Sequence, residues 1–153
     1  MKIQTIILSI LFAFVISELQ YLPNEDTFLG LKDKAKVRIK SNCDSKYEFQ
    51  NSRAVSKPDE VSPGGEMNLK VIGQGTKHHD SVIIRVEALL NDQPAYNREF
   101  IPQNKEINVA KDYFYEFTNP VPAFVPKGNF KIYVYLVDGD VRLSCLLAEF
   151  DFK

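Results

Sequence analysis

Apolar and polar residues alternate with a period of two over much of this chain, most clearly near its carboxyl end. One face of residues 129–137 carries the apolar side chains Phe130, Ile132, Val134 and Leu136. The opposite face carries Lys131, Tyr133 and Tyr135. Because successive side chains of a strand point to opposite faces, the pattern predicts a strand with one buried face. Asp138-Gly139 predicts a hairpin turn into a second strand, whose inward face carries Leu146, Ala148, Phe150 and Phe152.

The same alternation predicts strands at residues 66–71 and 81–90. Their inward faces carry Met67, Leu69 and Val71 in the first, and Val82, Ile84, Val86, Ala88 and Leu90 in the second. Shorter strands are expected at residues 36–40, 46–50, 96–101, 107–109 and 112–118, and turns at 57–65 and 91–94. No stretch has the period of 3.6 residues that indicates a helix. We therefore expect about seven to nine strands in an all-β, two-sheet immunoglobulin-like sandwich.

A proline-spaced loop over residues 119–128 precedes the last hairpin. Each proline lacks an N–H group and fixes its own φ angle, so this loop is neither a helix nor a central strand. Phe124 and Val125 lie in it between Pro122 and Pro126. Surface loops normally avoid such residues unless they cover something. The two residues either close the end of the sandwich as ordinary core or gate an apolar pocket between the sheets.

Length and charge fit one domain with a sizeable core. The chain has 153 residues, with 19 basic and 20 acidic side chains and a formal net charge of −1. A near-neutral chain without a basic block argues against nucleic acid as a partner, and against a strongly electrostatic grip on membranes.

Residues 1–17 have the pattern of a secretory signal peptide: Lys2 precedes a short apolar run, and polar residues follow it. The run is short for a membrane span, which needs about 20 residues, although an uncleaved anchor is the alternative. We expect an N-terminal arm at residues 18–42, a sandwich domain at 43–153, and a secreted or lumenal (lysosomal or vacuolar) protein.

The cysteines and histidines limit the kinds of bond, metal site and catalysis that the chain can support. Cys43 and Cys145 are the two cysteines, and in an exported chain a disulfide is the default, with two free thiols as the alternative. His78 and His79, followed by Asp80, are expected to form a solvated polar turn. We find no nucleophile motif, and Asp138-Gly139-Asp140 lacks the further ligands of a calcium loop. The sequence predicts a protein that is not an enzyme and uses neither cofactor nor metal.

Several short motifs, in their order and spacing, resemble those of a known family. They are Cys43 before the first core strand, Ser-Pro-Gly-Gly-Glu-Met-Asn-Leu at 62–69, Val-Pro-Lys-Gly-Asn-Phe at 125–130, and Val-Asp-Gly-Asp at 137–140 leading to Leu-Ser-Cys at 143–145. Together they resemble the ML lipid-recognition family, which includes the Niemann-Pick type C sterol carrier, the ganglioside activator and the fungal phosphatidylglycerol/phosphatidylinositol transfer proteins. The last two motifs are most similar to the transfer-protein branch.

The resemblance implies a sandwich whose sheets splay to hold a lipid, with the disulfide Cys43–Cys145 linking early and late strands. It implies a monomeric carrier of a phosphatidylglycerol or phosphatidylinositol type of phospholipid that contacts membranes transiently. The implied cavity lining is Met67, Leu69, Val71, Val82, Ile84, Val86, Phe130, Ile132, Val134, Leu136 and Phe150, and the implied mouth is Phe117, Phe124 and Val125. The family's further short-loop disulfides are missing, which leaves the choice of lipid open. A sterol carrier of the same fold and a secreted module that docks on a protein receptor are the alternatives.

Overall fold

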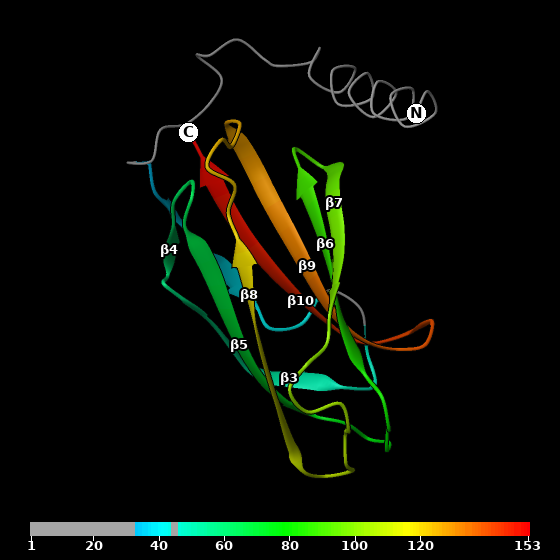
Figure 1. Cartoon of the computed structure of the whole chain (residues 1–153). Coiled ribbons are helices and arrows are strands. Elements are labelled where there is room, and N and C mark those ends of the chain that lie inside the picture. The colour runs from blue at the N-terminus through cyan, green and yellow to red at the C-terminus, as the bar shows by residue number, and fades with distance from the viewer. Residues whose placement is uncertain (1–32, 44–45) are drawn as a thin grey trace, which may run out of the picture.

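The computed structural model describes residues 33–43 and 46–153, and all regular secondary structure in them is β (Figure 1). The strands are β1 Ala35–Lys36, β2 Arg38–Lys40, β3 Gln50–Lys57, β4 Glu60–Val61, β5 Glu66–Gln74, β6 Ile83–Leu90, β7 Gln93–Phe100, β8 Asp112–Pro120, β9 Gly128–Asp138 and β10 Val141–Phe152. The predicted signal peptide and the first part of the predicted arm lie outside the described residues. Within the described residues, no helix has the length and apolar character to cross a membrane.

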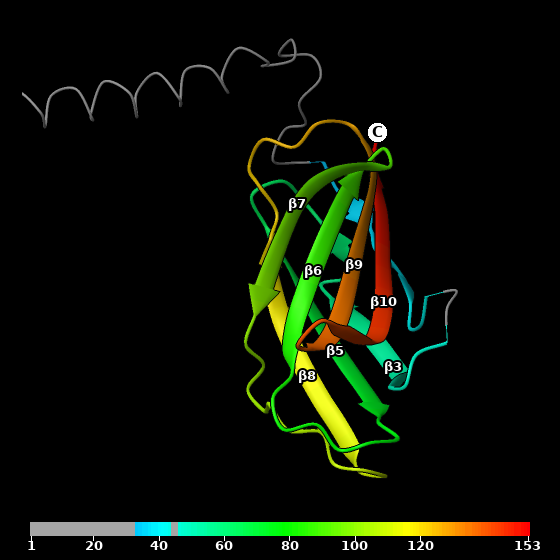
Figure 2. The same cartoon turned by 90° about the vertical axis from the view of Figure 1, so that its right-hand side faces the viewer.

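Two antiparallel sheets form the layers of the sandwich (Figure 2). One sheet has five strands in the order β2-β10-β9-β6-β7, and the other has three in the order β3-β5-β8. The short strands β1 and β4 pair separately. This arrangement confirms the predicted all-β, two-sheet sandwich.

The core lies between the inward faces of the two sheets, where the alternating pattern places it. On the three-stranded sheet Met67, Leu69 and Val71 are fully buried, and Leu69 pairs with Phe117 of β8. On the five-stranded sheet Val86 pairs with Val134. Two inward faces that interdigitate in this way form the core of a β-sandwich.

The carboxyl-terminal hairpin has the predicted form. β9 and β10 pair from Gly128 opposite Phe152 to Asp138 opposite Val141. Gly139 in the turn has a φ of 56°, in the left-handed region that favours glycine. On the outer face of this sheet, Cys145 of β10 forms the predicted disulfide with Cys43, across a sequence separation of 102 residues.

The strand predicted at residues 46–50 is wrong except at its last residue, because β3 begins only at Gln50. Phe49 instead turns into the core, where its ring packs edge-on against Tyr113 with centroids 5.8 Å apart. Its N–H donates to the Leu143 carbonyl over 2.9 Å. A Cβ at Gly73 would lie 2.4 Å from the Phe49 ring, so the glycine makes room for this anchor. One aromatic anchor therefore produced the apolar signal that alternation assigned to a strand.

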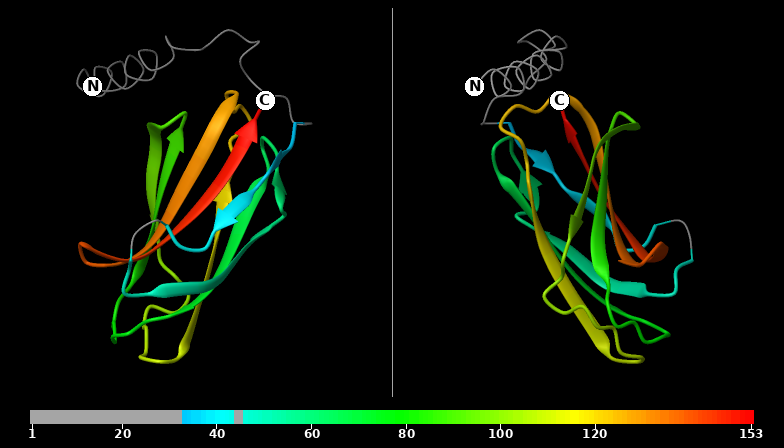
Figure 3. Two further views of the ribbon diagram at one scale, coloured as in Figure 1. Left: turned by 180° about the vertical axis from the view of Figure 1, so that it is seen from behind. Right: turned by 45° about the vertical axis from the view of Figure 1, so that its right-hand side comes forward.

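The first strands lie inside the segment expected to be an arm. β2 pairs with β10 at the edge of the five-stranded sheet, as the back view in Figure 3 shows, and this confirms the edge strand predicted within residues 36–40. β1 pairs with β4, which lies within the long turn predicted at 57–65. The predicted brief pairing near residue 107 is also present, as a bridge between Ile107 and His79.

A candidate apolar ligand site at one end of the sandwich

A cavity of about 190 Å³ lies between the sheets at the end of the molecule that is uppermost in Figure 1. It is bounded by the ends of β6 and β8, the start of β7, the proline-spaced loop, and β9 and β10. The lining residues are Ala88, Leu90, Ala95, Tyr96, Asn119, Pro120, Val121, Pro122, Phe124, Val125, Pro126, Phe130, Ile132 and Phe150. None of these side chains is charged. The predicted apolar cavity is therefore present, at one end of the sandwich.

The floor of the cavity is built by cross-strand neighbours of the five-stranded sheet. Phe130 of β9 pairs with both Leu90 and Phe150, and its ring stacks on that of Phe150 with centroids 5.3 Å apart. Ile132 pairs with Ala88, whose small side chain leaves space above the sheet. The small side chain of Ala88 beside the larger Ile132 and Phe130 therefore leaves the space that forms the cavity, and the proline-spaced loop covers it.

The proline-spaced loop is tied down by backbone hydrogen bonds to the turn that precedes β5. The Val121 N–H donates to the Gly65 carbonyl over 2.9 Å, and the Gly64 N–H reaches the carbonyls of Val121 and Pro122 at 3.1 and 3.0 Å. Gly64 has a φ of 75°, a left-handed conformation that glycine adopts without strain. These bonds fix the loop as a cover over the cavity.

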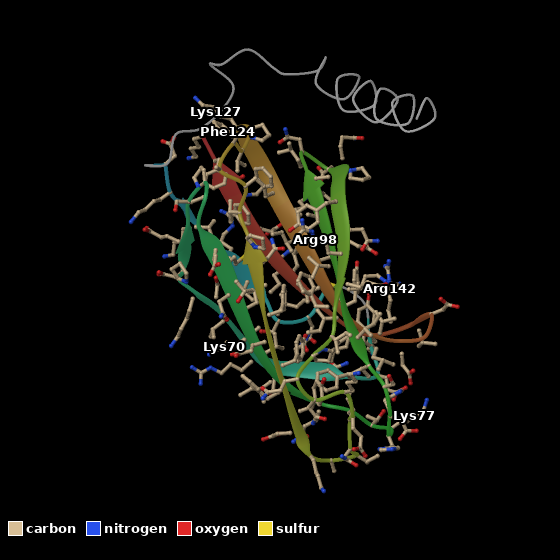
Figure 4. All side chains as sticks on the ribbon, in the orientation of Figure 1. Lys70, Lys77, Arg98, Phe124, Lys127 and Arg142 are labelled. Atoms are coloured by element: carbon tan, nitrogen blue, oxygen red, sulfur yellow. A yellow bond between two sulfur atoms is a disulfide. The ribbon has the colours of Figure 1, made fainter. Side chains whose placement is uncertain are left out.

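Phe124 and Val125, the apolar pair of this loop, point in different directions. Val125 is 3% exposed and belongs to the core, whereas Phe124 is 78% exposed. Figure 4 shows Phe124 near Lys127 at this end of the molecule. Val125 thus fits the interpretation as a core plug, and Phe124 is left as an apolar side chain in solvent beside the cavity.

The structure brings some of the sequence-predicted lining residues to this cavity. Phe130, Ile132 and Phe150 line it, as do Phe124 and Val125 from the predicted mouth. The other predicted residues fill the core away from it, namely Met67, Leu69, Val71, Val82, Ile84, Val86, Val134, Leu136 and, from the predicted mouth, Phe117. The sheets are closely packed along most of their length and leave space at one end.

Sequence reasoning missed the polar members of the lining, Tyr96 and Asn119. Asn119 follows Tyr113, Tyr115 and Phe117 at every second position of β8, so the alternation that places those rings inward places the amide inward too. Its Nδ2 donates to the Tyr96 hydroxyl, and Asn119 is 3% exposed. Burial raises the pKa of Tyr96. The hydrogen bond from the Asn119 side chain and the charge of Arg98 act in the opposite direction but are weaker, so the phenol stays neutral.

A second cluster lies at the opposite end, around His79. Its Nε2 lies 2.9 Å from Glu48 Oε1 and its Nδ1 lies 2.7 Å from Asp138 Oδ2. The predicted solvated turn is correct for exposed His78 and wrong for His79, which is 13% exposed on its side chain. Burial opposes the charged ring, but the two carboxylates outweigh it, and the pKa of His79 is raised. The ring therefore joins three segments, and the contacts favour its charged form.

His78, Asp80 and Glu106 form the one group of potential metal ligands among the residues the structure describes. Their ligand atoms lie within 4.8 Å of one another, and all three residues are exposed. His78 Nε2 already lies 2.8 Å from Asp80 Oδ1. Exposed side chains that pair with one another are common on protein surfaces, so this group does not define a site.

The chain matches no protein-family model and no curated protein sequence. Among solved structures it is similar to chicken MD-1 complexed with lipid IVa, at a TM-score of 0.50 and 12% identity, over 82% of this chain and 95% of that one. It is also similar to a Niemann-Pick type C2 protein from Japanese carpenter ant, at a TM-score of 0.54 and 14% identity, over 71% and 94%. These likenesses show the fold that the ML resemblance implies.

A further match is the alkylpurine DNA glycosylase AlkC of Pseudomonas fluorescens, bound to DNA with an abasic site analog. Its TM-score is 0.50 at 13% identity, over 71% of this chain but 31% of that one. The sandwich thus corresponds to one part of that enzyme. A fold shared by such different proteins does not identify a function, which has to be argued from the site.

Proposed function

We propose that the protein is a secreted carrier that binds the apolar part of a lipid in the end cavity and moves it between membranes. The observation that carries this proposal is an uncharged, largely apolar cavity between the sheets, covered by a loop that holds Phe124 in solvent. MD-1 complexed with lipid IVa and the Niemann-Pick type C2 protein support it, because both share the fold.

The physics of lipid transport gives the cavity its role. Moving an acyl chain of about 16 carbons into water costs roughly 13 kcal/mol, at about 0.8 kcal/mol for each methylene group. Free diffusion of such a lipid is negligible, so a carrier must enclose the chain in a dry space. No covalent chemistry is needed, because uptake and release follow from opening and closing of the cavity at a membrane.

A whole lipid requires the cavity to widen. Its volume of about 190 Å³ is below the range of about 300 to 1,000 Å³ that is usual for ligand pockets. β7 and β8 are neighbouring edge strands of different sheets and form no ladder with each other. Side-chain contacts join them, including Tyr96 to Asn119 and Phe100 to Phe117, whose ring centroids are 5.6 Å apart. Widening between these strands therefore leaves every backbone ladder intact.

For a phospholipid of the phosphatidylglycerol or phosphatidylinositol type, the anionic headgroup would stay outside. An ionised phosphate among uncharged side chains would lose its hydration without gaining a partner. Exposed Phe124 would enter the membrane interface with Lys127 beside it, which provides the transient membrane contact. The disulfide Cys43–Cys145 supports an oxidising, extracellular or lumenal destination.

The experiment that tests this proposal is native mass spectrometry of the full chain secreted by a eukaryotic host, followed by lipid extraction. A transfer assay would then use phosphatidylcholine vesicles that carry a minor fraction of phosphatidylglycerol, phosphatidylinositol or sterol. We expect a bound lipid mass and faster transfer than in protein-free controls. A folded protein that carries no lipid and takes none from any vesicle would contradict the proposal and favour a receptor-binding module.

A further inference from the structure

The cavity contains a single hydrogen-bonding pair in an apolar surface. Among the lining side chains Tyr96 and Asn119 alone are polar, and they come from facing sheets, on β7 and β8. Every other lining side chain is an aliphatic group, a proline or a phenylalanine. A ligand in this cavity therefore meets a fixed polar point, whatever the length of its apolar part.

The pair has hydrogen-bonding capacity left over. Asn119 Nδ2 donates to the Tyr96 oxygen, and within the described residues neither side chain has a second hydrogen-bond partner. The Tyr96 O–H is therefore free to donate, and the carboxamide oxygen of Asn119 is free to accept. If the amide were turned over, the pair would still have one donor and one acceptor to offer.

The group that fits this pair both donates and accepts, and it is uncharged. A hydroxyl meets that description with one oxygen. A carboxylate or phosphate does not, because it cannot donate and no cationic side chain lines the cavity to balance its charge. A purely apolar ligand would cover the pair and leave its remaining donor and acceptor unsatisfied, which is unfavourable.

We infer that Tyr96 and Asn119 recognise the hydroxyl of an uncharged lipid alcohol whose apolar part fills the cavity. This inference rests on the proposed function and selects a ligand class within it. Tyr96 and Asn119 become the specificity-determining residues of the site. The same pair also joins the two sheets at β7 and β8, so a ligand hydroxyl that inserts between them acts where the cavity must widen.

The experiment uses small probes that match the present volume. A dry cavity of about 150 Å³ holds benzene in a well-studied protein, so the cavity of about 190 Å³ is suited to six-carbon compounds. The probes are 1-hexanol, 1-chlorohexane, which has a similar shape but no hydroxyl, and hexanoate, which is charged. Dissociation constants are measured by amide chemical-shift titration of the full chain, in the wild type and in Tyr96→Phe/Asn119→Leu.

We expect the double variant to bind 1-hexanol about tenfold to thirtyfold more weakly than the wild type, because it removes both hydrogen bonds to the hydroxyl and each neutral hydrogen bond carries about fivefold. Its affinity for 1-chlorohexane should be unchanged or higher, because the variant removes the polar pair that an apolar ligand leaves unsatisfied. The single variant Tyr96→Phe should lie between the wild type and the double variant. Tyr133→Phe, on the outer face of β9, is the matched control and should leave both probes unaffected. Hexanoate should bind the wild type more weakly than 1-hexanol.

Each other outcome has a distinct meaning. If the double variant weakens both neutral probes by the same factor, or if hexanoate binds as well as 1-hexanol, the hydroxyl recognition is wrong while the lipid carrier stands. If no probe shifts the amide signals around Ala88, Ile132 and Phe150, and no vesicle lipid is taken up, the recognition and the proposed carrier are both overturned. Amide chemical shifts away from the cavity that match those of the wild type serve as the check that the variant is folded.

Discussion

His79 Nδ1 lies 2.7 Å from Asp138 Oδ2, and this contact ties the loop before β6 to the end of β9 that is farthest from the cavity. Glu48 holds the other ring nitrogen, and Lys77 in turn lies 3.1 Å from Glu48. Both ring nitrogens can donate together only when the imidazole is protonated. The end of the sandwich opposite the cavity is thus closed by a charged histidine between carboxylates.

The first prediction is that the protein loses stability as the pH rises past neutral. The pKa of His79 is raised above its ordinary value of 6.5, so the folded chain binds that proton more tightly than the unfolded chain. This stabilisation is complete below 6.5 and disappears as the pH rises through the folded-state value. The free energy of unfolding in urea should therefore fall as the pH rises from about 6.5 through the folded-state pKa of His79.

His79→Gln is the variant that tests the source of this dependence. It should lower the free energy of unfolding at about pH 6 by about 1 to 2 kcal/mol and flatten the slope above it. Exposed His78→Gln is the matched control and should keep most of the slope. Glu48 affects stability at acidic pH, because its pKa is lowered, chiefly by the hydrogen bond with His79. Its contribution to stability is lost as the pH falls through its folded-state pKa. A slope in His79→Gln as steep as that of the wild type would contradict the assignment.

The second prediction concerns the disulfide. Cys43 and Cys145 close a loop across 102 residues, and the chain-entropy model assigns about 4 to 5 kcal/mol of stability to such a closure. Cys43→Ser should lower the melting temperature markedly and release one thiol that a reagent detects after denaturation. Denatured wild-type protein without reductant should show no free thiol, and two free thiols in that sample would contradict the disulfide.

The third prediction separates membrane contact from folding. Because Phe124 is largely exposed, Phe124→Ser should change the free energy of unfolding by less than about 0.5 kcal/mol. It should nevertheless slow lipid transfer between vesicles by about fivefold, since it removes apolar surface that would enter the bilayer interface. Phe114→Ser removes another exposed ring, on the outer face of β8 away from the cavity, and should leave transfer unchanged. Equal transfer rates in the two variants would argue against a docking role for the loop.

Strand positions could be predicted because alternation is a local property. The inward positions of β5, β6 and β9 are decided by the strand's own period, and the structure buries Met67, Val86 and Val134 accordingly. The same reasoning failed at Phe49. Tyr47 and Phe49 are two residues apart, the spacing of one face of a strand, but Phe49 packs into the core from an irregular segment. β1 and β4 are too short to show any periodicity. They form because they pair with each other, although β2 and β3 separate them in the sequence.

The site was harder to predict than the fold. Alternation identifies which side chains face the other sheet, but it does not say where along the strands the sheets separate. For that reason Leu69 and Leu136 were expected in a lining and lie in close-packed core instead. Asn119 could have been found from its inward register on β8, whereas its partner Tyr96 depends on how β7 lies beside β8, which no local pattern records.

The last prediction tests whether the cavity is the lipid site. Ala95 lies at the exposed rim and contributes to the lining. Ala95→Trp should place an indole over the opening, which should weaken lipid binding by tenfold or more, as expected when more than about 1.4 kcal/mol of contact with the ligand is lost. Because the position is exposed, the free energy of unfolding should change by less than about 0.5 kcal/mol. Asn97→Trp adds the same side chain on the same strand outside the lining and should bind lipid as the wild type does. Lipid uptake from vesicles, measured by native mass spectrometry, decides between them, and equal uptake by both variants would place the lipid elsewhere.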